Sequence, residues 1–415
     1  MNLFEQAPGD GSGSPAVAVI GGGPAGLFAA EVLSARGCQV TVYDQMPTVG
    51  RKLLMAGRGG LNLTHSEPLD RFRTRYGAAT EQLRPFLDAF PPEALIAWAE
   101  GLGQTTFVGS SGRVFPRAMK ASPLLRAWLK RLADQGVRLR PGTEWLGWDD
   151  AGALSFRDQP AERADAVVLA LGGASWPRLG STGEWARILE ARRIGVAPFR
   201  PANSGVITHW SEAFAARFAG TPIKGLALSF EGRTVRGEAM ITRQGLEGGG
   251  IYALSAPLRD AIARAGRAVL TLDLRPDRSE ESLAASLNRP HGGQSISNIL
   301  RKAAGLAPVA TNLIRESHGG RLPESLAHGV KHVEIIVTGM QGLERAISSA
   351  GGIRWSEVDE ALMIKALPGV FVAGEMLDWE APTGGYLLQA CFATGVAAAK
   401  GVLRWLAPAI PADDA

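Results

Sequence analysis

The chain has 415 residues, of which 46% are hydrophobic and 20% charged, so it has room for two or three globular domains. Its 44 basic and 40 acidic residues nearly balance, which gives no argument for a nucleic-acid partner. The two cysteines, Cys38 and Cys391, exclude a disulfide framework and a cysteine zinc site, and we expect no bound metal. Glycine is enriched to 52 residues, against an average of about 7%, which indicates many tight turns or close approaches of backbone to ligand.

The N-terminal residues 1–14 are rich in Gly, Ser and Pro and lack the basic and apolar regions of a signal peptide. We expect them to form a flexible leader. Since no uninterrupted apolar run reaches about 18 residues, we also expect no transmembrane helix and a cytoplasmic protein.

A strand, a glycine loop, a helix and a second strand follow one another in the first part of the chain. Residues 16–20 form a continuous apolar run typical of a buried parallel strand. The loop 21–26 (GGGPAG) follows at once, and residues 25–36 favour a helix that ends at a glycine. Residues 39–43 (QVTVY) predict a second strand, which ends on the acid Asp44. This order predicts a βαβ unit that binds a dinucleotide.

Three of the loop's glycines have a separate purpose in such a unit. Gly21 permits the tight turn, Gly23 lets the backbone approach a pyrophosphate, and Gly26 allows close packing of helix on strand. The helix N-terminus then faces the phosphates with free N–H groups. Asp44 is placed to accept a hydrogen bond from a ribose 2′-hydroxyl. We assign three neighbours to the same site, namely Pro24, Ala25 and Gln45.

The glycine-rich segment 50–65 follows the second strand, and its glycines disfavour a regular helix through its second half. We expect a loop over the ligand in which Arg51 and Lys52 neutralise phosphates and backbone N–H groups meet a flat ring. Asn62 is assigned to this loop. The alternative is a solvated basic loop without a ligand.

Two later strands are each expected to end at the ligand side of the same sheet. Residues 164–174 predict a buried strand that runs into a glycine turn, with Ala170 and Gly172 beside the ligand. Residues 369–375 predict another strand, which ends on Gly374 and Glu375. Because a Glu375 carboxylate suits the hydroxyls of a ribityl chain, which nicotinamide cofactors lack, this segment favours FAD.

A glycine turn also precedes the final helical segment. Gly384 and Gly385 are followed by Tyr386 and Leu387, and this turn is expected to point helix N–H groups at the N1–C2 carbonyl region of a flavin. The alternative is a packing turn that binds no ligand. We place Trp145 beside the adenine, because its strand falls where the third strand of the sheet is expected.

We assign no catalytic acid or base. His65 follows the glycine-rich loop and could relay a proton, but an exposed or capping histidine is favoured. Tyr386 is expected to pack against the flavin ring, and Cys391 to be a small core residue without redox function.

On these motifs the chain resembles bacterial NAD(P)/FAD-dependent oxidoreductases of the aminoacetone-oxidase type, which include the BaiN-type flavoproteins. The resemblance covers most of the chain and rests on four blocks: GGGPAG (21–26), GRKLLMAGRGGLNLTH (50–65), LGGASWPRLGSTG (171–183) and AGEMLDWEAPTGGYLLQACFATG (373–395). The family pattern has a cysteine where this chain has Leu61, so any chemistry of that thiol does not carry over, and the chain is similar to a divergent branch.

The resemblance implies an α/β fold: a Rossmann-type FAD domain, similar to proteins with two dinucleotide-binding domains, with a β-barrel-like and helical insert. We expect FAD-binding parts at 15–197 and 340–405, a substrate or lid domain at 198–339, and a tail at 406–415. Within the insert, alternating runs predict antiparallel strands.

The function expected from the sequence is an FAD-dependent oxidoreductase that passes hydride between NAD(P)H, or a small organic donor, and a small-molecule acceptor. Because no second glycine loop follows a strand, NAD(P)H is expected to bind only transiently. An RNA-modifying flavoenzyme is an alternative, although only about 20 residues follow Gly395 and no C-terminal RNA-binding domain is expected. A flavin-binding protein without turnover is another. The substrate, the choice of NADH or NADPH and the oligomeric state stay open.

Overall fold

The computed structural model describes residues 14–290 and 292–407, so nearly all of the predicted leader (1–14) and tail (406–415) lies outside the described residues. The chain forms two compact units. The first unit combines the chain up to Arg200 with the chain from Ser348 onwards, and the second unit is Pro201–Ile347.

The first unit is built on a five-stranded parallel sheet in the order β20-β10-β1-β2-β6. Its central strands are buried on both faces, as the apolar runs of the sequence predict. The predicted first two strands match the observed bounds. The strands are β1 (Ala16–Ile20), β2 (Gln39–Asp44), β6 (Arg138–Pro141), β10 (Ala166–Leu169) and β20 (Val370–Val372).

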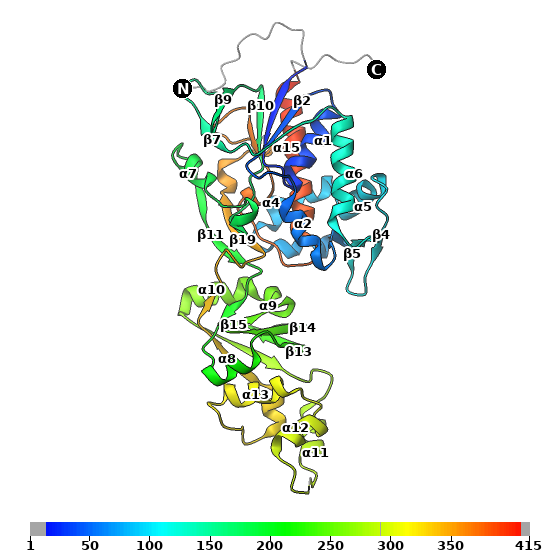
Figure 1. Cartoon of the computed structure of the whole chain (residues 1–415), viewed down its shortest axis with the longest axis vertical. Helices are drawn as coiled ribbons and strands as arrows, with labels where there is room; N and C mark the ends of the chain where they lie inside the picture. Colours follow the sequence, from blue (N-terminus) through cyan, green and yellow to red (C-terminus); the bar gives the residue numbers. More distant parts are fainter. Residues whose placement is uncertain (1–13, 291, 408–415) are drawn as a thin grey trace. The chain divides into compact units, whose positions relative to one another are not determined.

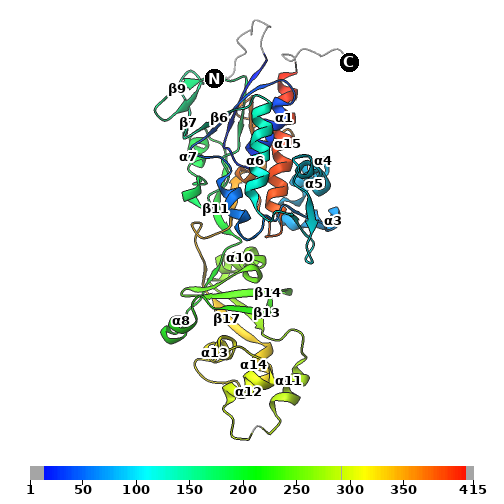
Figure 2. The same cartoon turned by 45° about the vertical axis from the view of Figure 1, so that its right-hand side comes forward.

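Three long helices lie side by side along this sheet: α1 (Pro24–Ser34), α6 (Ala121–Asp134) and α15 (Tyr386–Leu406) (Figures 1 and 2). Pro24 begins α1, where its fixed φ fits and its missing N–H costs no hydrogen bond. The helices α1 and α15 approach closely, because Gly395 lies against the backbone of Ala25, where a Cβ atom would be 2.5 Å from the Ala25 carbonyl oxygen.

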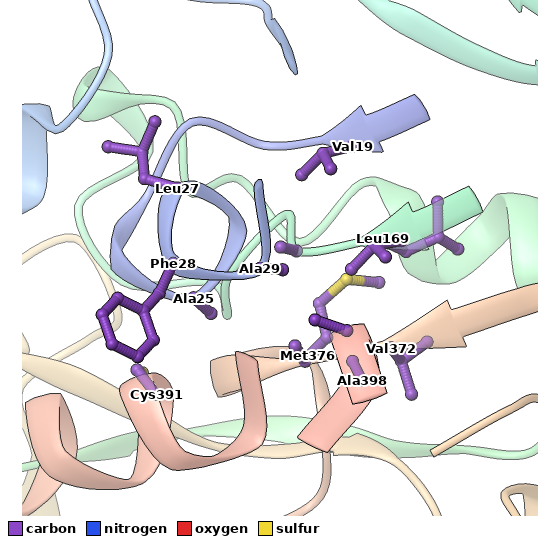
Figure 3. Close-up of a cluster of buried hydrophobic side chains, with 14 of the residues drawn as sticks. Val19, Ala25, Leu27, Phe28, Ala29, Leu169, Val372, Met376, Cys391 and Ala398 are labelled. Atoms are coloured by element: carbon purple, nitrogen blue, oxygen red, sulfur yellow. The ribbon is translucent and has the colours of Figure 1, made fainter. Parts of the chain in front are cut away.

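An aromatic cluster fills the space around this helix contact. The ring centroid of Phe28 lies 5.0 Å from that of Phe392 on α15 and 5.2 Å from that of Trp98. Cys391 is buried next to Phe28 and Ala25 (Figure 3). By length and composition α15 could cross a membrane, but 72% of its apolar window is buried inside the protein, as is typical of a core helix.

Smaller elements surround the sheet and helices. One antiparallel sheet joins β3 (Thr64–His65), β5 (Arg113–Pro116) and β4 (Thr106–Val108). Another joins β7 (Trp145–Trp148), β8 (Leu154–Phe156) and β9 (Gln159–Glu162), and a pair joins β11 (Val196–Ala202) to β19 (Ser348–Ile353). The shorter helices are α2 (Arg51–Ala56), α3 (Leu69–Arg73), α4 (Thr80–Ala89), α5 (Pro92–Gly101) and α7 (Trp185–Glu190). Short 3-10 helices lie at η1 (Gly57–Gly59), η2 (Thr74–Ala79), η3 (Pro177–Leu179), η4 (Trp355–Glu357) and η5 (Gly374–Met376).

The second unit is a seven-stranded antiparallel sheet in the order β17-β16-β13-β14-β15-β12-β18. The two end strands, β17 and β18, are separated in the chain by Thr338 alone, and the Thr208 hydroxyl donates to the Ile336 carbonyl at 2.6 Å. The sheet therefore curls into a barrel. Its strands are β12 (Val206–Ile207), β13 (Pro222–Phe230), β14 (Arg233–Thr242), β15 (Gly245–Glu247), β16 (Ala268–Asp273), β17 (Val333–Val337) and β18 (Gly339–Met340).

Helices cover this barrel and form a second apolar cluster with it, centred on residues such as Leu228, Leu270 and Leu313. The helices are α8 (Glu212–Phe218), α9 (Gly249–Ala253), α10 (Ser255–Ala265), α11 (Glu280–Leu287), α12 (Ile296–Ala303), α13 (Pro308–Ser317) and α14 (Leu326–Lys331). The expected fold class, a Rossmann-type α/β domain with a β-barrel-like and helical insert, is confirmed.

The observed bounds of the insert differ from the expected 198–339. The second unit runs from Pro201 to Ile347 because β18 stays in its sheet, paired with β12, instead of returning to the cofactor domain. Its designation as a substrate or lid domain stays a prediction.

The helix contact at Gly395 generates a first prediction. Replacing Gly395 with Ala should lower the free energy of unfolding of the first unit by about 1–3 kcal/mol, because the added methyl group overpacks a backbone contact that cannot relax cheaply. Denaturant unfolding followed by tryptophan fluorescence measures this, since every tryptophan except Trp210 belongs to this unit.

The matched control is Gly101→Ala at the end of α5, where the nearest atom to an added Cβ, on Arg131, is 3.7 Å away. This variant should be as stable as the wild type or slightly more stable. Equal unfolding midpoints for the two variants would show that the α1–α15 contact is not tightly packed.

Candidate functional site

The glycine loop after β1 places its three predicted glycines in three different environments. Gly21 has a φ of 112°, and a Cβ atom on it would clash with the Ala170 carbonyl group. A Cβ on Gly26 would clash with the Gly21 carbonyl oxygen. A Cβ on Gly23 would meet no atom of the described residues within 4 Å. Two glycines are therefore required by the protein's own packing, whereas Gly23 faces open space at the N-terminus of α1.

Asp44 connects the end of β2 to this loop. Its carboxylate accepts hydrogen bonds from the backbone N–H groups of Gly22 at 2.9 Å and Met46 at 2.8 Å. Burial raises the pKa of Asp44, although these two hydrogen bonds and the charge of Arg51 act in the opposite direction. The neighbouring Gln45 donates to the Gly180 carbonyl at 2.7 Å. The acid is thus fixed beside the glycine loop, at the carboxyl edge of the sheet.

The loops after β10 and β20 meet the glycine loop at the same edge. The Ala170 N–H donates to the Ile20 carbonyl at 2.7 Å, and Gly172, with a φ of 75°, accepts from the Trp185 indole at 2.8 Å. A Cβ on Gly374 would lie 2.9 Å from that of Ala25. The carboxyl ends of parallel strands are where ligands bind in open α/β sheets, so these contacts gather the predicted residues at one place.

Lys52 and Glu375 form an ion pair at this edge, although they are 323 positions apart in the chain. The Lys52 ammonium donates to Glu375 at 2.8 Å, to the Ser175 hydroxyl at 3.0 Å and to the Ser181 hydroxyl at 3.3 Å. The Glu375 side chain is only 6% exposed. The neighbouring Arg51 donates to the Thr48 hydroxyl at 3.2 Å. The two charges predicted to bind different parts of the cofactor are therefore adjacent.

The turn before α15 has an unusual backbone that only glycine adopts without strain. Gly384 has a φ of 138° and Gly385 a φ of 90°. A Cβ on Gly385 would lie 2.5 Å from the Cα of Thr64, so the turn is pressed against β3. With its amide oriented to satisfy both partners, Asn62 accepts from the Gly385 N–H at 3.1 Å and donates to the Thr64 carbonyl at 3.0 Å. The segment after Leu61 thus supports the N-terminus of α15.

Tyr386, the first residue of α15, is fixed by partners that the sequence did not predict. Its hydroxyl donates to the Glu67 carboxylate at 2.6 Å, and Arg75 donates to the same carboxylate through two hydrogen bonds of 2.9 and 2.6 Å. His65 stacks on the Tyr386 ring with a centroid distance of 5.5 Å, and Phe72 packs against it at 4.8 Å. The Tyr386 ring is 4% exposed.

These contacts shift the ionisation of both acidic partners. Burial raises the pKa of Tyr386, and the hydrogen bond to Glu67 adds to the shift, so the phenol stays protonated. The pKa of Glu67 is lowered, because its hydrogen bonds from Arg75 and Tyr386 outweigh the effect of partial burial. The pair therefore keeps a neutral phenol bound to a carboxylate anion at neutral pH. Leu387, which follows Tyr386, packs on the main apolar cluster.

His65 and Cys391 lie where their expected structural functions place them. His65 Nδ1 accepts from the Glu67 N–H at 3.1 Å, so its Nε2, 3.0 Å from the Ser111 carbonyl, is the donor. Both ring nitrogens are thus engaged in local hydrogen bonds. Burial raises the pKa of the Cys391 thiol, so it is a protonated core side chain rather than a nucleophile.

The strand of Trp145 was expected to be the third strand of the parallel sheet, and this expectation is wrong. The strand next to β2 is β6, and Trp145 begins β7 in a separate antiparallel sheet, because the chain turns sharply at Gly142, where φ is 71°. The Trp145 indole is 6% exposed and its ring lies 5.0 Å from that of Trp148. The adenine contact therefore loses its topological support and stays untested.

The chain matches the family described as HI0933-like protein Rossmann domain over residues 15–401. The chain belongs to this family. The resemblance inferred from the motifs is thus confirmed, and with it the class of FAD-dependent oxidoreductases. The match begins one residue before β1 and includes the inserted barrel.

Relatives of the chain align over nearly their whole lengths. The chain is 26% identical to the 3-dehydro-bile acid delta(4,6)-reductase of Clostridium scindens, with 92% of this chain and 98% of that protein covered. It is 23% identical to the ribosomal RNA dihydrouridine synthase of Escherichia coli, with 93% and 97% covered. The solved 3-ketosteroid delta1-dehydrogenase of Sterolibacterium denitrificans, at 14% identity, is similar in fold, with a TM-score of 0.52 and 95% and 100% coverage.

The residues gathered at the sheet edge suit FAD. Because Gly23 has no side chain, its backbone leaves space beside the first turn of α1. The N–H groups of that turn have no partners within the helix, so they suit a pyrophosphate. The half-buried Asp44 carboxylate and the buried Glu375 carboxylate are hydrogen-bond acceptors of the kind that ribose and ribityl hydroxyls require. The N-terminus of the 21-residue α15 supplies a positive dipole end.

The open side of Gly23 generates a second prediction. Gly23→Ala should fold like the wild type, because the new methyl group meets no atom of residues 14–290 and 292–407 within 4 Å and the φ of −85° suits any residue. It should weaken FAD binding about tenfold or more, or about 1.4 kcal/mol, because the methyl group fills the space needed for the pyrophosphate. Titration of the apoprotein with FAD, followed by flavin fluorescence, measures the Kd.

Gly101→Ala adds the same methyl group on α5 and should leave the Kd unchanged. If Gly23→Ala bound FAD as tightly as the wild type, the pyrophosphate could not lie against this loop.

The Glu67 carboxylate generates a third prediction, on pH dependence. A lowered pKa stabilises the folded state above the ordinary value of 4.5, and this stabilisation is lost as the pH falls through the folded-state pKa. Glu67→Gln should therefore cost about 1–3 kcal/mol of unfolding free energy at pH 7 and less at pH 4. Denaturant unfolding at both pH values measures the difference from the wild type.

Glu81→Gln is the control, since Glu81 is 71% exposed and pairs only with the neighbouring Arg84 among the contacts of the described residues. Its effect should be near zero at both pH values. A Glu67→Gln cost that did not change with pH would contradict the assigned ionisation.

Proposed function

We propose that the edge described above holds FAD and that the enzyme uses it to reduce a carbon–carbon double bond conjugated to a carbonyl group. The observation that carries the FAD proposal is that Ala25, in the glycine loop, contacts both Gly374, which precedes Glu375, and Gly395 of α15, so that segments from opposite ends of the chain meet. When bound, FAD would supply hydride transfer at its N5 atom.

The protein's own groups would share the work of holding this cofactor. The α1 N-terminus at Gly23, Pro24 and Ala25 would bind the pyrophosphate, and Asp44 the ribose of the adenosine half. Lys52 and Glu375, already paired, would bind the polar chain between the phosphates and the ring. The Lys52 ammonium also donates to two serine hydroxyls. Lys52 and Glu375 could therefore exchange a hydrogen-bond partner for a cofactor group without leaving a buried charge unpaired.

The turn at Gly384 and Gly385 would lie against the flavin ring. Its N–H groups begin α15, where the helix dipole stabilises negative charge on the reduced ring. Tyr386 is held by Glu67 and Arg75, so it would form a rigid side of the pocket rather than a mobile proton donor. Asn62 would hold the same turn in place through its hydrogen bond from the Gly385 N–H.

The substrate class is suggested by what two groups of relatives have in common. A 3-dehydro-bile acid with Δ4,6 unsaturation carries double bonds conjugated to its 3-oxo group, and the Clostridium scindens relative is named as its reductase. Dihydrouridine is uridine reduced at a double bond conjugated to the ring carbonyl, and two relatives are named as its synthases. Both reductions can be made by adding hydride to an electrophilic carbon conjugated with a carbonyl, which is β to it in an enone or a uracil ring and β or δ to it in a dienone. A small cyclic enone is therefore the proposed substrate class.

We further propose that NAD(P)H reduces the flavin in a transient encounter. The support is the single glycine loop of the dinucleotide type in the sequence, which the flavin would occupy. A cytoplasmic location agrees with a supply of NAD(P)H and with two buried free thiols.

The second candidate function is reduction of uridine in ribosomal RNA. The Haemophilus influenzae and Escherichia coli synthases align with this chain over 98% and 97% of their own lengths, so nearly the whole of each synthase has a counterpart in this chain. Against it stand the lower identities, 22% and 23%, and the near balance of basic and acidic residues.

A fourth prediction tests the proposed function in two half-reactions. Under anaerobic conditions, NADH or NADPH should bleach the flavin absorbance of the holoenzyme. A 3-oxo-4-ene steroid or 2-cyclohexenone should then restore it and be converted to the saturated ketone, as measured by mass spectrometry. An unmodified ribosomal RNA transcript is the second acceptor to test, at two salt concentrations.

Reoxidation by the enone and not by RNA would support the leading proposal, and the reverse result would support the RNA function. If a chemically reduced enzyme reacted with neither acceptor, the enone proposal would fall. Gly101→Ala is the control and should match the wild type in both half-reactions.

A further inference from the structure

Three potential metal ligands gather in the second unit, apart from every residue assigned to the cofactor. The His328 Nδ1 atom lies 3.3 Å from one Glu280 carboxylate oxygen, and the His332 Nε2 atom lies 3.6 Å from the other. One ligand atom from each of the three residues lies within 4.8 Å of the others. The two imidazole rings stack with a centroid distance of 4.4 Å and an interplanar angle of 28°.

The local sequence fixes this arrangement. His328 and His332 are four residues apart at the end of α14, so they share one face of the helix, and the His332 N–H closes the last turn on the His328 carbonyl at 2.8 Å. Ser325 begins α14 by accepting from the His328 N–H at 3.2 Å. Glu280 is the first residue of α11, which begins at the Ser279 cap. All three ligands therefore sit on anchored helix ends.

Buried apolar side chains hold the two helices together. Leu283 and Leu287 on α11 and Ala327 and Val330 on α14 belong to the same buried cluster. Lys331 precedes His332 in the chain, but its positive charge could neutralise Glu280 in place of a metal ion only if Lys331 gave up its own partners. Its ammonium is paired with Asp273 at 2.7 Å and donates to the Arg275 and Arg278 carbonyls.

We propose that Glu280, His328 and His332 form a binding site for a divalent transition-metal ion such as Zn²⁺. Two imidazole nitrogens and one carboxylate are a ligand set that suits Zn²⁺, Ni²⁺ or Cu²⁺ far better than Mg²⁺ or Ca²⁺. Ligand atoms about 3.3–3.5 Å apart match a tetrahedral ion with bonds of about 2.0–2.1 Å. The two histidine–carboxylate distances are close to this, and because each goes to a different Glu280 oxygen, the carboxylate would bind through both oxygens or rotate to offer one.

The partial exposure of the ligands leaves at least one coordination position for water. The side chains of His328, His332 and Glu280 are 58%, 49% and 38% exposed, respectively. An ion bound here would tie the N-terminus of α11 to the C-terminus of α14 in the helical part of the insert. The sequence predicts no metal site, because the fold brings the carboxylate to the histidines from a different helix.

A fifth prediction tests this site with Zn²⁺ and the tag-free, FAD-loaded holoenzyme. Competition with a chromogenic chelator should give one tightly bound Zn²⁺ per chain. His332→Gln and Glu280→Gln should each weaken this binding at least about tenfold, because even indirect partners of metal ligands cost that much. His209→Gln, which removes an exposed histidine of the same unit, is the matched control and should bind Zn²⁺ like the wild type.

Co²⁺ gives an independent readout, since ligation by imidazole and carboxylate produces visible d–d absorption that His332→Gln should abolish. Circular dichroism checks that the variants fold. No stoichiometric binding, or equal affinity in wild type, His332→Gln and Glu280→Gln, would overturn the proposal. These readouts do not depend on turnover, so they stand apart from the test of the proposed function.

Discussion

The contact between α15 and α1 is the constraint on which the rest of the first unit depends. Gly395 lets the C-terminal helix lie directly on the backbone of Ala25, at the start of the helix that follows the glycine loop. This contact fixes how far α15 is shifted along its own axis relative to α1 and the sheet. It thereby sets where the Gly384–Gly385 turn and Glu375 arrive, and these are the parts of the proposed FAD site farthest from the loop in sequence.

Charges in this region are paired with other groups of the protein itself. Lys52 and Glu375 satisfy one another with help from two serine hydroxyls, and Glu67 is satisfied by Arg75 and Tyr386. A buried carboxylate without such partners would be costly, so the pairs allow acids to stand at the ligand edge without destabilising the fold. The first pair faces the proposed cofactor chain, and the second pair fixes the residue that begins α15.

Sequence alone predicted what depends on local pattern. The first two strands, the glycine loop and the later strands at Ala170 and Glu375 follow from apolar runs that end in glycine, and the structure gathers them at one edge. It missed Glu67 and Arg75, because a hydrogen bond across 319 positions leaves no local signal. The strand of Trp145 was wrongly expected in the parallel sheet, because a turn at Gly142 takes the chain out of that sheet. The cluster of Glu280 with His328 and His332 likewise exists only once two helices pack.

Gly21, Gly23 and Gly26 of the loop should be subject to different selection. Gly21 and Gly26 are held by the protein's own carbonyl groups, so any descendant that keeps the fold must keep them, whatever it binds. Among the described residues no atom would contact a Cβ on Gly23, so a bound pyrophosphate is the constraint that we expect to remove variants there. A lineage that lost its cofactor should therefore drift first at Gly23 while retaining the glycines on either side, and this one position would record the loss in sequence.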